Sequence, residues 1–343
     1  MQYEITLGIP VYAAADYIAE TMKSALGQTY SDIEFLIVDD RADDGTIDIV
    51  EHIKRDHPRG KDIRIIRNDK NMGVSFCRNL IMDEARGKYL YFLDSDDTIE
   101  SYTIQLLIDA IKAFQAQVAY ASYDIIDSVK GSVVRTYQKD KLQLSQEGEL
   151  AIYAFKNTHI FHVSVCNVLV DVDFLRKTGV RFIDTNFWED MAFTTELITK
   201  VSRAVLLPDV TYHYLQHLES LSHYRERELL TKEEIMQNAS TIAYLKGKAK
   251  EMKGHSCLPF LCSYLEMNSF YMVCHILKRN SRIVPKISCS EMQLILQHPF
   301  GLCDVLHFRN ERWQNIWFWL LGRMPIFIAI SSVWLLGKIK RVI

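Results

Sequence analysis

Residues 88–97 read Lys-Tyr-Leu-Tyr-Phe-Leu-Asp-Ser-Asp-Asp, an apolar stretch typical of a buried strand that runs directly into three carboxylates. Asp94, Asp96 and Asp97 lie within four positions, so their charges repel one another unless a cation or fixed donors offset them. A divalent ion that carries a phosphate-rich ligand would do so, because Mg²⁺ and Mn²⁺ prefer oxygen and leave positions for phosphate. The alternative is a solvated acidic turn in which Asp97 caps a helix.

The sequence on both sides of this stretch alternates between short apolar runs and segments of helical period, from residue 3 to residue 123. This alternation predicts an α/β fold in which a parallel sheet is covered by helices on both faces. The expected strands are Tyr3–Ile9, Ile33–Val38, Ile63–Arg67, Tyr89–Leu93 and Val118–Ser122.

Later parts of the chain have a different pattern. Residues 124–188 predict a mixed region, with a hairpin around Gly131 and another β-rich stretch at Phe161–Val170. Beyond residue 225 the pattern becomes helical. The sequence therefore predicts a domain at residues 1–225 and a helical C-terminal region at residues 226–343.

Composition sets broad limits on function. The 343 residues are 48% hydrophobic, with a formal net charge of -3, which allows a large core and gives no reason to expect nucleic acid as a partner. The seven cysteines form no CxxC pair, so we expect reduced thiols in a cytoplasmic protein. The first expected strand begins almost at Met1, where a secretory signal would lie, and we expect no secretion.

Acidic pairs end or follow several of the predicted strands and helices. Asp39-Asp40 follow Phe-Leu-Ile-Val, and Glu189-Asp190 open a helix late in the region. Ligands of open α/β sheets bind outside the carboxyl ends of the strands, where Asp39 and Asp94 are both expected. The sequence has neither GxGxxG after the first strand nor GxxxxGK[ST] anywhere, which weakens the case for a dinucleotide fold or a P-loop.

These segments together resemble the inverting glycosyltransferases of family 2, which have the GT-A fold: a Rossmann-like, mixed but mostly parallel sheet flanked by helices. The resemblance covers roughly the first two thirds of the chain and includes segments similar to the VDDGSTDGT signature, the DxD motif and the ED motif. The segments are Ile9-Pro10-Val11-Tyr12, Ser24 to Tyr30, Val38-Asp39-Asp40 through Asp44-Gly45-Thr46, Asn71-Met72-Gly73 with Arg78-Asn79, Phe92 to Asp97, Trp188-Glu189-Asp190, and Tyr212-His213-Tyr214 through Ser220-Leu221-Ser222.

The chain departs from the family pattern at a few positions. Arg41 stands where a glycine is usual, Ala42 and Asp43 replace a Ser-Thr pair, and Val168 follows Asn167 where relatives commonly carry lysine. Because only glycine has free access to positive φ, we expect the backbone around Arg41 to differ from the usual turn.

The resemblance implies a site for a nucleoside-diphosphate sugar, most readily a UDP-sugar. Asp39 would accept the imide N–H of uracil, and Tyr12 would either stack on the base or belong to the core. Asp96 would ligate Mn²⁺ or Mg²⁺, while Asp94 would touch the ribose or a metal-bound water. The implied nucleotide-sugar residues are Pro10, Val11, Tyr12, Asp39, Asp40, Arg78, Asp94, Ser95 and Glu189.

Asp190 is the implied catalytic base. It would take the proton from the acceptor hydroxyl as that oxygen attacks the anomeric carbon opposite the leaving group, which inverts the configuration. A base needs a pKa near working pH, and the neighbouring Glu189 and Trp188 are expected to raise the pKa of Asp190. His213, His217 and His223 could reach the diphosphate or a metal, although a structural role is the more common one for such residues.

The C-terminal segment 313–341 combines tryptophans with basic residues. From residue 300 onward six Lys or Arg stand against two Asp or Glu, a local charge of +4. Peripheral contact with anionic lipid is one interpretation. A buried closing helix and a seam between two copies in a homo-oligomer are the others.

The sequence thus predicts a metal-dependent inverting glycosyltransferase that extends a glycan or lipid-linked acceptor in surface polysaccharide synthesis, in the cytoplasm or on the inner face of the membrane. A polyprenyl-phosphate sugar transferase is an alternative that should show membrane helices. Nucleotidyl transfer would need a lysine-rich loop. A scaffold that keeps the donor fold without catalysis is the non-enzymatic alternative.

Overall fold

The computed structural model describes residues 3–161, 164–217 and 229–343. The chain divides into two compact units. The first holds Met1–Leu150 with Asn157–Leu218, and the second holds Ala151–Lys156 with Glu219–Ile343. The predicted boundary between residues 225 and 226 lies outside the described residues, so it stays a prediction.

The first unit is built on one sheet with the strand order β3-β2-β1-β4-β9-β6-β10-β5, with β7 beside β6 and β8 beside β10. The longer ladders, β1–β2, β1–β4, β2–β3 and β6–β10, are parallel, whereas β9 runs antiparallel to both β4 and β6. The mixed, mostly parallel sheet is therefore confirmed. Its strands are β1 (Tyr3–Val11), β2 (Ile33–Asp39), β3 (Ile63–Arg67), β4 (Gly87–Phe92), β5 (Thr98–Ile99), β6 (Val118–Asp127), β7 (Val133–Tyr137), β8 (Leu142–Leu144), β9 (Val168–Asp171) and β10 (Ala204–Gln216).

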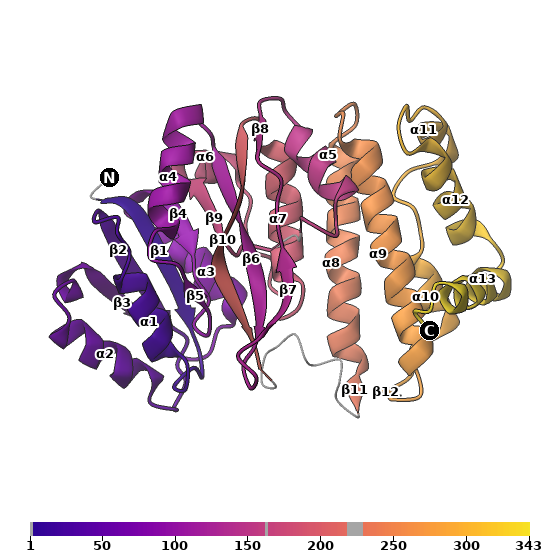
Figure 1. The fold of residues 1–343 in the computed structure, drawn as a ribbon. Coiled ribbons are helices and arrows are strands. Elements are labelled where there is room, and N and C mark those ends of the chain that lie inside the picture. Colours follow the sequence, from indigo (N-terminus) through magenta and orange to yellow (C-terminus); the bar gives the residue numbers. More distant parts are fainter. Residues whose placement is uncertain (1–2, 162–163, 218–228) are drawn as a thin grey trace. The chain divides into compact units, whose positions relative to one another are not determined.

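Helices lie on both faces of this sheet (Figure 1). Alternate residues of β1 divide between the faces, as the pleat requires: Ile5, Leu7 and Ile9 share a buried cluster with side chains of α1, α2 and α4. On the other face α3 packs so closely that a Cβ at Gly8 would lie 2.4 Å from Cγ2 of Ile81. The helices of this unit are α1 (Ile18–Leu26), α2 (Thr46–Asp56), η1 (Gly60–Asp62), α3 (Val74–Glu84), α4 (Thr103–Phe114), α6 (Val172–Thr178) and α7 (Glu189–Lys200).

The predicted strands are found within a few residues of their expected ends, and β3 has the expected bounds. The hairpin around Gly131 is confirmed, since β6 and β7 pair antiparallel across it and Gly131 has φ 64. The β-rich stretch predicted at Phe161–Val170 is wrong for most of its described length, because the strand begins only at Val168. Asn167 has φ 54, a left-handed conformation that interrupts an extended chain.

The second unit is helical apart from a short parallel pair, β11 (Leu230–Thr231) and β12 (Ile283–Val284). Most of α5 (Glu149–Lys156) belongs to this unit, and Phe155 of that helix stacks on Tyr264 with ring centroids 5.0 Å apart. The remaining helices are α8 (Lys232–Glu251), α9 (Leu258–Arg279), α10 (Cys289–Ile295), α11 (Leu302–Leu306), α12 (Arg312–Arg323) and α13 (Ile326–Ile339).

Candidate active site

In the strand order β3-β2-β1-β4, the chain runs from β1 to β2 and β3 on one side and then returns to β4 on the other side of β1. The strand order therefore changes direction at β1, which is a topological switch point. Crevices at such points are where open α/β sheets bind ligands. The register aligns Val11 of β1, Asp39 of β2 and Arg67 of β3 in one row across the carboxyl edge. Arg67 Nε lies 3.9 Å from Oδ2 of the buried Asp39.

Asp39 and Asp40 have different surroundings at this edge. Asp39 accepts the backbone N–H of Arg41 at 3.0 Å. Asp40 accepts the N–H groups of Met72 and Gly73, both at 2.8 Å, and the Asn68 side-chain amide at 2.7 Å. Asp40 therefore fixes the loop before α3, and the nucleotide contact expected of it stays a prediction.

At the same edge, the interpretation of Tyr12 as a core residue is wrong. Tyr12 is 53% exposed, which excludes the core interpretation and leaves its ring available beside the buried Pro10 and Val11. Arg41 has φ 66, so it adopts the left-handed conformation that a glycine would favour. For a residue other than glycine this conformation costs about 1–2 kcal/mol, and the difference from the usual family turn expected around Arg41 stays a prediction.

Arg78 connects the two acidic motifs. Its guanidinium is buried on α3 and contacts three carboxylates: Nη2 donates to Asp94 Oδ1 at 2.8 Å, and Nη1 donates to Glu189 Oε1 at 2.9 Å and to Asp190 Oδ1 at 2.6 Å. The turn after β4 and the start of α7 are thereby held together. The resemblance implied a nucleotide-sugar contact for Arg78, and the alternative was an ion pair on the helix surface. The structure shows an ion-pair centre, and a phosphate contact stays a prediction.

The segment before α7 is tied to α3 by further contacts. Asn79 donates to the carbonyl of Phe182 at 2.8 Å and accepts its N–H at 3.0 Å, and Ser75 donates to the carbonyl of Thr185 at 2.9 Å. The Phe182 ring lies under the Arg78 guanidinium and stacks on Phe193 of α7, with centroids 4.0 Å apart. These contacts bring Glu189 and Asp190 to Arg78 across more than a hundred residues of sequence.

Burial and charge shift the pKa values of this cluster. Burial raises the pKa of Glu189 to about 7, with help from the charge of Asp190 and against the pull of Arg78. Burial also raises the pKa of Asp190, opposed by Arg78 and assisted by Asp94. The expected raised pKa at Asp190 is present, but its causes are burial and Asp94, whereas the sequence suggested Glu189 and Trp188. For Arg78 burial acts to lower the pKa, and the three carboxylates outweigh it.

The turn after β4 separates its carboxylates. Asp97 is fully buried, where its two oxygens accept the Tyr212 hydroxyl at 2.5 Å and the N–H of Leu215 at 2.8 Å. It precedes β5, so the helix cap suggested for Asp97 is wrong. Burial and the charges of Asp96 and Asp94 raise the pKa of Asp97 well above its ordinary value.

Asp96 is the more accessible member of that turn. Its Oδ2 lies 2.9 Å from Nε2 of His217, whose ring stacks on Tyr17 at 4.5 Å. The backbone carbonyl of Ser95 accepts the Thr21 hydroxyl at 3.0 Å, so the expected sugar-nucleotide contact of Ser95 stays a prediction. Carboxylate oxygens are the ligands that Mn²⁺ and Mg²⁺ prefer, and Asp96, with His217 beside it, is the residue that could hold such an ion.

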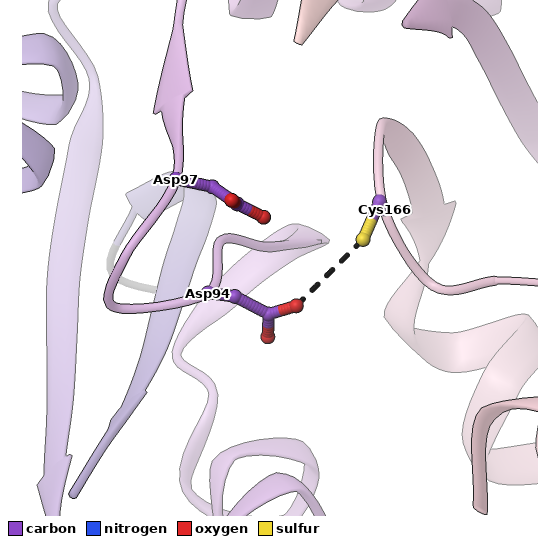
Figure 2. Close-up of side chains that lie close together, drawn as sticks. All are labelled: Asp94, Asp97 and Cys166. Carbon is purple, nitrogen blue, oxygen red and sulfur yellow. Dashed lines mark hydrogen bonds between the residues drawn. The ribbon is translucent and has the colours of Figure 1, made fainter. Parts of the chain in front are cut away.

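A second group of ligand atoms lies deeper. Figure 2 shows Asp94 and Asp97 facing Cys166, with the Cys166 thiol 3.7 Å from Asp94 Oδ2. Burial and the charges of Asp94, Asp97 and Asp190 raise the pKa of Cys166 well above its ordinary value. A neutral thiol beside an already bonded Asp97 does not fit a hard oxygen-seeking ion, and the metal contact expected of Asp96 stays a prediction.

The other histidines have different positions. His213 lies between Asp124, at 2.7 Å, and Glu100, at 3.1 Å, which is a structural pairing away from Asp96. His223 lies outside the described residues. The sequence analysis missed Arg67, whose signal is its register with Asp39. It also missed Ser164, which lies beside Asp190 with no local signal in the sequence.

The sequence model described as Glycosyl transferase family 2 matches residues 6–179, about half of the chain. The chain belongs to this family. It is therefore a glycosyltransferase, and the resemblance drawn from the motifs is confirmed.

Curated relatives of this family 2 glycosyltransferase extend the match. The chain is 26% identical over 306 residues to the succinoglycan biosynthesis protein ExoO of Rhizobium meliloti, covering 87% of this chain and 83% of the relative. It is 28% identical over 244 residues to the UDP-Glc:alpha-D-GlcNAc-diphosphoundecaprenol beta-1,3-glucosyltransferase WfaP of Escherichia coli, covering 70% and 88%.

A solved structure with the same fold is that of S. aureus TarS 1-349 in complex with UDP-GlcNAc. The TM-score is 0.65 at 17% identity, and the alignment covers 93% of this chain and 90% of that one. This likeness confirms the GT-A fold of the family 2 glycosyltransferase described here.

Proposed function

We propose that this glycosyltransferase moves a sugar, with inversion and with the help of a divalent metal ion, from a UDP-sugar to a hydroxyl of a glycan or lipid-linked acceptor in polysaccharide synthesis. The observation that carries this proposal is the Arg78 centre. Arg78 joins two carboxylates in one ion-pair network. One is Asp94, at the carboxyl edge of the sheet where the donor is proposed to bind, and the other is Asp190, the candidate base.

The donor side follows from the row at the carboxyl edge. The buried Asp39 offers an acceptor to a base imide, and the half-exposed Tyr12 offers a ring against which the base can stack. One relative is named for transfer from UDP-Glc, and TarS is solved with UDP-GlcNAc. Both names support a UDP-sugar as the donor.

The turn at Asp94–Asp97 provides the metal side of the donor site. A bound Mn²⁺ or Mg²⁺ would supply Lewis-acid neutralisation of the charge that grows on the departing diphosphate. Asp96 and His217 are the residues placed to hold it, because they already lie 2.9 Å apart and are less enclosed than Asp97. Asp97 orders the turn from inside through Tyr212 and Leu215.

Asp190 acts as the base. Arg78 holds its Oδ1, which fixes the orientation of the carboxylate, while its Oδ2 lies 3.5 Å from the Ser164 hydroxyl. Oδ2 is therefore the oxygen that takes the proton from the acceptor hydroxyl. The raised pKa of Asp190 makes this carboxylate a stronger base than an ordinary aspartate, so the transfer is more favourable near neutral pH.

The acceptor class rests on the relatives. ExoO is named for succinoglycan biosynthesis, and WfaP is named for an acceptor on diphosphoundecaprenol. A polyprenyl-phosphate sugar transferase is the second enzymatic candidate. A scaffold that binds donor without transfer is the non-enzymatic one.

The test is a panel on the parent chain with UDP-Glc or UDP-GlcNAc, Mn²⁺ and a lipid-diphosphate-linked sugar. We expect Asp96→Ala to weaken the Mn²⁺-dependent thermal shift given by UDP. Asp190→Asn should keep that shift and lose transfer by about 10²–10⁴-fold. Asp173→Asn, at an exposed position on α6, is the matched control and should do neither.

The outcomes separate the parts of the proposal. Full transfer by Asp190→Asn would exclude Asp190 as the base. Transfer to polyprenyl phosphate in place of the linked sugar would establish the second candidate. Donor binding without transfer, with the parent and Asp190→Asn alike, would establish the scaffold.

A further inference from the structure

Helices α12 and α13 place large apolar side chains outward. The exposed fractions are 79% for Trp313, 79% for Phe327, 44% for Trp334 and 69% for Ile339. Single exposed apolar residues need no explanation, but a set of them on two consecutive helices does. Both helices are at the yellow end of the chain in Figure 1, and both pack against α9.

Each of these helices buries another face, and on α12 that face consists of Asn315, Phe318, Leu321 and Gly322. On α13 it consists of Ala329, Val333 and Gly337, and a Cβ at Gly337 would lie 3.0 Å from the Cys274 sulfur of α9. On α12 the buried Asn315 donates to Pro259 at 3.0 Å and to Ser263 at 2.9 Å. Both helices therefore already have a buried face packed within the protein, and the exposed apolar side chains on their other faces are left for something outside the chain.

Charge narrows the choice of partner. From Arg312 to Ile343 the chain has five Lys or Arg and no Asp or Glu, although the whole chain is acidic. The same segment holds four of the five tryptophans. Tryptophan is enriched at the membrane–water interface, and clustered basic residues are attracted to anionic lipid headgroups.

The aromatic and basic groups lie together. Lys338 Nζ lies 3.9 Å from the ring centre of Trp334, and the Arg323 guanidinium lies 5.8 Å from that of Trp319. With this arrangement a ring can enter the headgroup layer while the neighbouring cation stays with the phosphates. In the part of the chain that the structure describes, no helix is long and apolar enough to cross a bilayer.

We propose that the outward faces of α12 and α13 bind the surface of an anionic phospholipid membrane. The helices lie on the membrane with their aromatic side chains in the headgroup region. A second copy of this chain is a poorer occupant, because a two-fold interface sets a patch against itself. That would bring five cations against five, with no carboxylate between residues 312 and 343. The proposal does not depend on the transfer reaction.

The test is sedimentation of the full chain with vesicles. One set contains equal parts phosphatidylglycerol and phosphatidylcholine, and the other contains phosphatidylcholine alone. We expect binding to the anionic vesicles to be at least about tenfold tighter and to weaken with added salt.

Two pairs of variants separate the apolar and charged contributions. Trp313→Ser with Phe327→Ser should weaken anionic-vesicle binding at least about tenfold, whereas Val133→Ser with Val134→Ser, exposed by 55% and 57% on β7, should not. Lys338→Glu with Lys340→Glu should also weaken it at least about tenfold, whereas Lys177→Glu with Lys250→Glu, at exposed positions elsewhere, should not. Thermal unfolding confirms that each variant is folded.

Three results would overturn the proposal. One is equal binding to both kinds of vesicle, and another is no binding to either. The third is a concentration-dependent dimer, seen by sedimentation equilibrium, that the Trp313 and Phe327 substitutions abolish. None of these results decides whether Asp190→Asn keeps or loses transfer to the lipid-diphosphate-linked sugar, so this proposal and the proposed function can fail separately.

Discussion

Arg78 Nη1 lies 2.6 Å from Asp190 Oδ1, and this ion pair joins the middle of α3 to the first turn of α7. Arg78 is buried and Asp190 is partly buried, and Arg78 also holds Asp94 and Glu189. One guanidinium thus determines the positions of three carboxylates that come from two distant parts of the sequence.

The first prediction concerns this guanidinium. Arg78→Ala leaves three partly buried carboxylates without their common cation, so the free energy of unfolding should fall by about 3–5 kcal/mol. Arg181→Ala is the matched control, since Arg181 binds Asp83 through two 2.6 Å contacts at the surface and should cost less than about 1 kcal/mol. Urea unfolding measures both. Equal losses of unfolding free energy would show that the Arg78 ion pairs contribute no more to stability than the exposed pair of Arg181 and Asp83.

The second prediction concerns pH and stability. The folded chain raises the pKa of Glu189 from 4.5 to about 7, so it favours the protonated form. The stability that this group contributes is present below about pH 4.5 and is lost as the pH rises to about 7. Glu189→Gln should therefore lose less stability than the parent between about pH 5 and pH 8. Melting temperatures of both proteins at the two pH values measure this. An equal change in melting temperature for the parent and for Glu189→Gln would contradict the prediction.

Transfer should have the opposite pH dependence. The base must be ionised, so the rate should rise with pH as the Glu189–Asp190 pair loses its protons, with an apparent pKa that belongs to the pair. The rate should keep rising up to about pH 7, the pKa of Glu189. A base with the pKa of an ordinary aspartate would be fully ionised at a much lower pH. A rate profile over pH, measured with saturating donor, gives this value. A flat profile between pH 5 and pH 8 would argue against a carboxylate base with a raised pKa.

Another prediction distinguishes two histidines of the β10 region. His217 lies beside Asp96, whereas His213 is held by Asp124 and Glu100. His217→Ala should weaken the apparent affinity for Mn²⁺ by about 10–100-fold, while His213→Gln should leave it unchanged. Titration of Mn²⁺ against UDP-induced thermal stabilisation measures both. If the two variants respond alike, His217 has no part in holding the ion.

The last prediction tests the packing of α3 on the sheet. Gly8→Ala would place a Cβ 2.4 Å from Cγ2 of Ile81, and such overpacking should cost about 1–3 kcal/mol. Gly247 lies within α8, and a Cβ added there would meet no heavy atom within 4 Å apart from the backbone of its own helix. Gly247→Ala should therefore stabilise the protein by about 0.4–1 kcal/mol. Chemical unfolding of both variants gives the comparison, and a neutral Gly8→Ala would mean that α3 can move away from β1.

Several parts of the fold could be predicted from local sequence. Alternating apolar runs located β1 to β4, and the position of Asp39 and Asp94 after their strands implied a shared edge before any contact was known. The family motifs added Asp190, which no local signal connects to Asp94.

Other parts depend on contacts that are distant in sequence. Asp97 looks like a cap in isolation, and only the arrival of Tyr212 and Leu215 from β10 makes it a buried acceptor. The antiparallel β9 enters between β4 and β6 after a long mixed region, where alternation cannot determine which strands become neighbours. Arg41 adopts φ 66, a conformation that its residue type alone argued against.

The assignment of Ala151–Lys156 to the second unit affects how the chain can be shortened. A truncation before α8 would look natural from the sequence, because it keeps every strand of the large sheet. It would also remove Tyr264 from the ring of Phe155, leaving an aromatic side chain and its helix exposed to water. An expression clone that ends there should aggregate unless α5 is redesigned with polar residues at the same time.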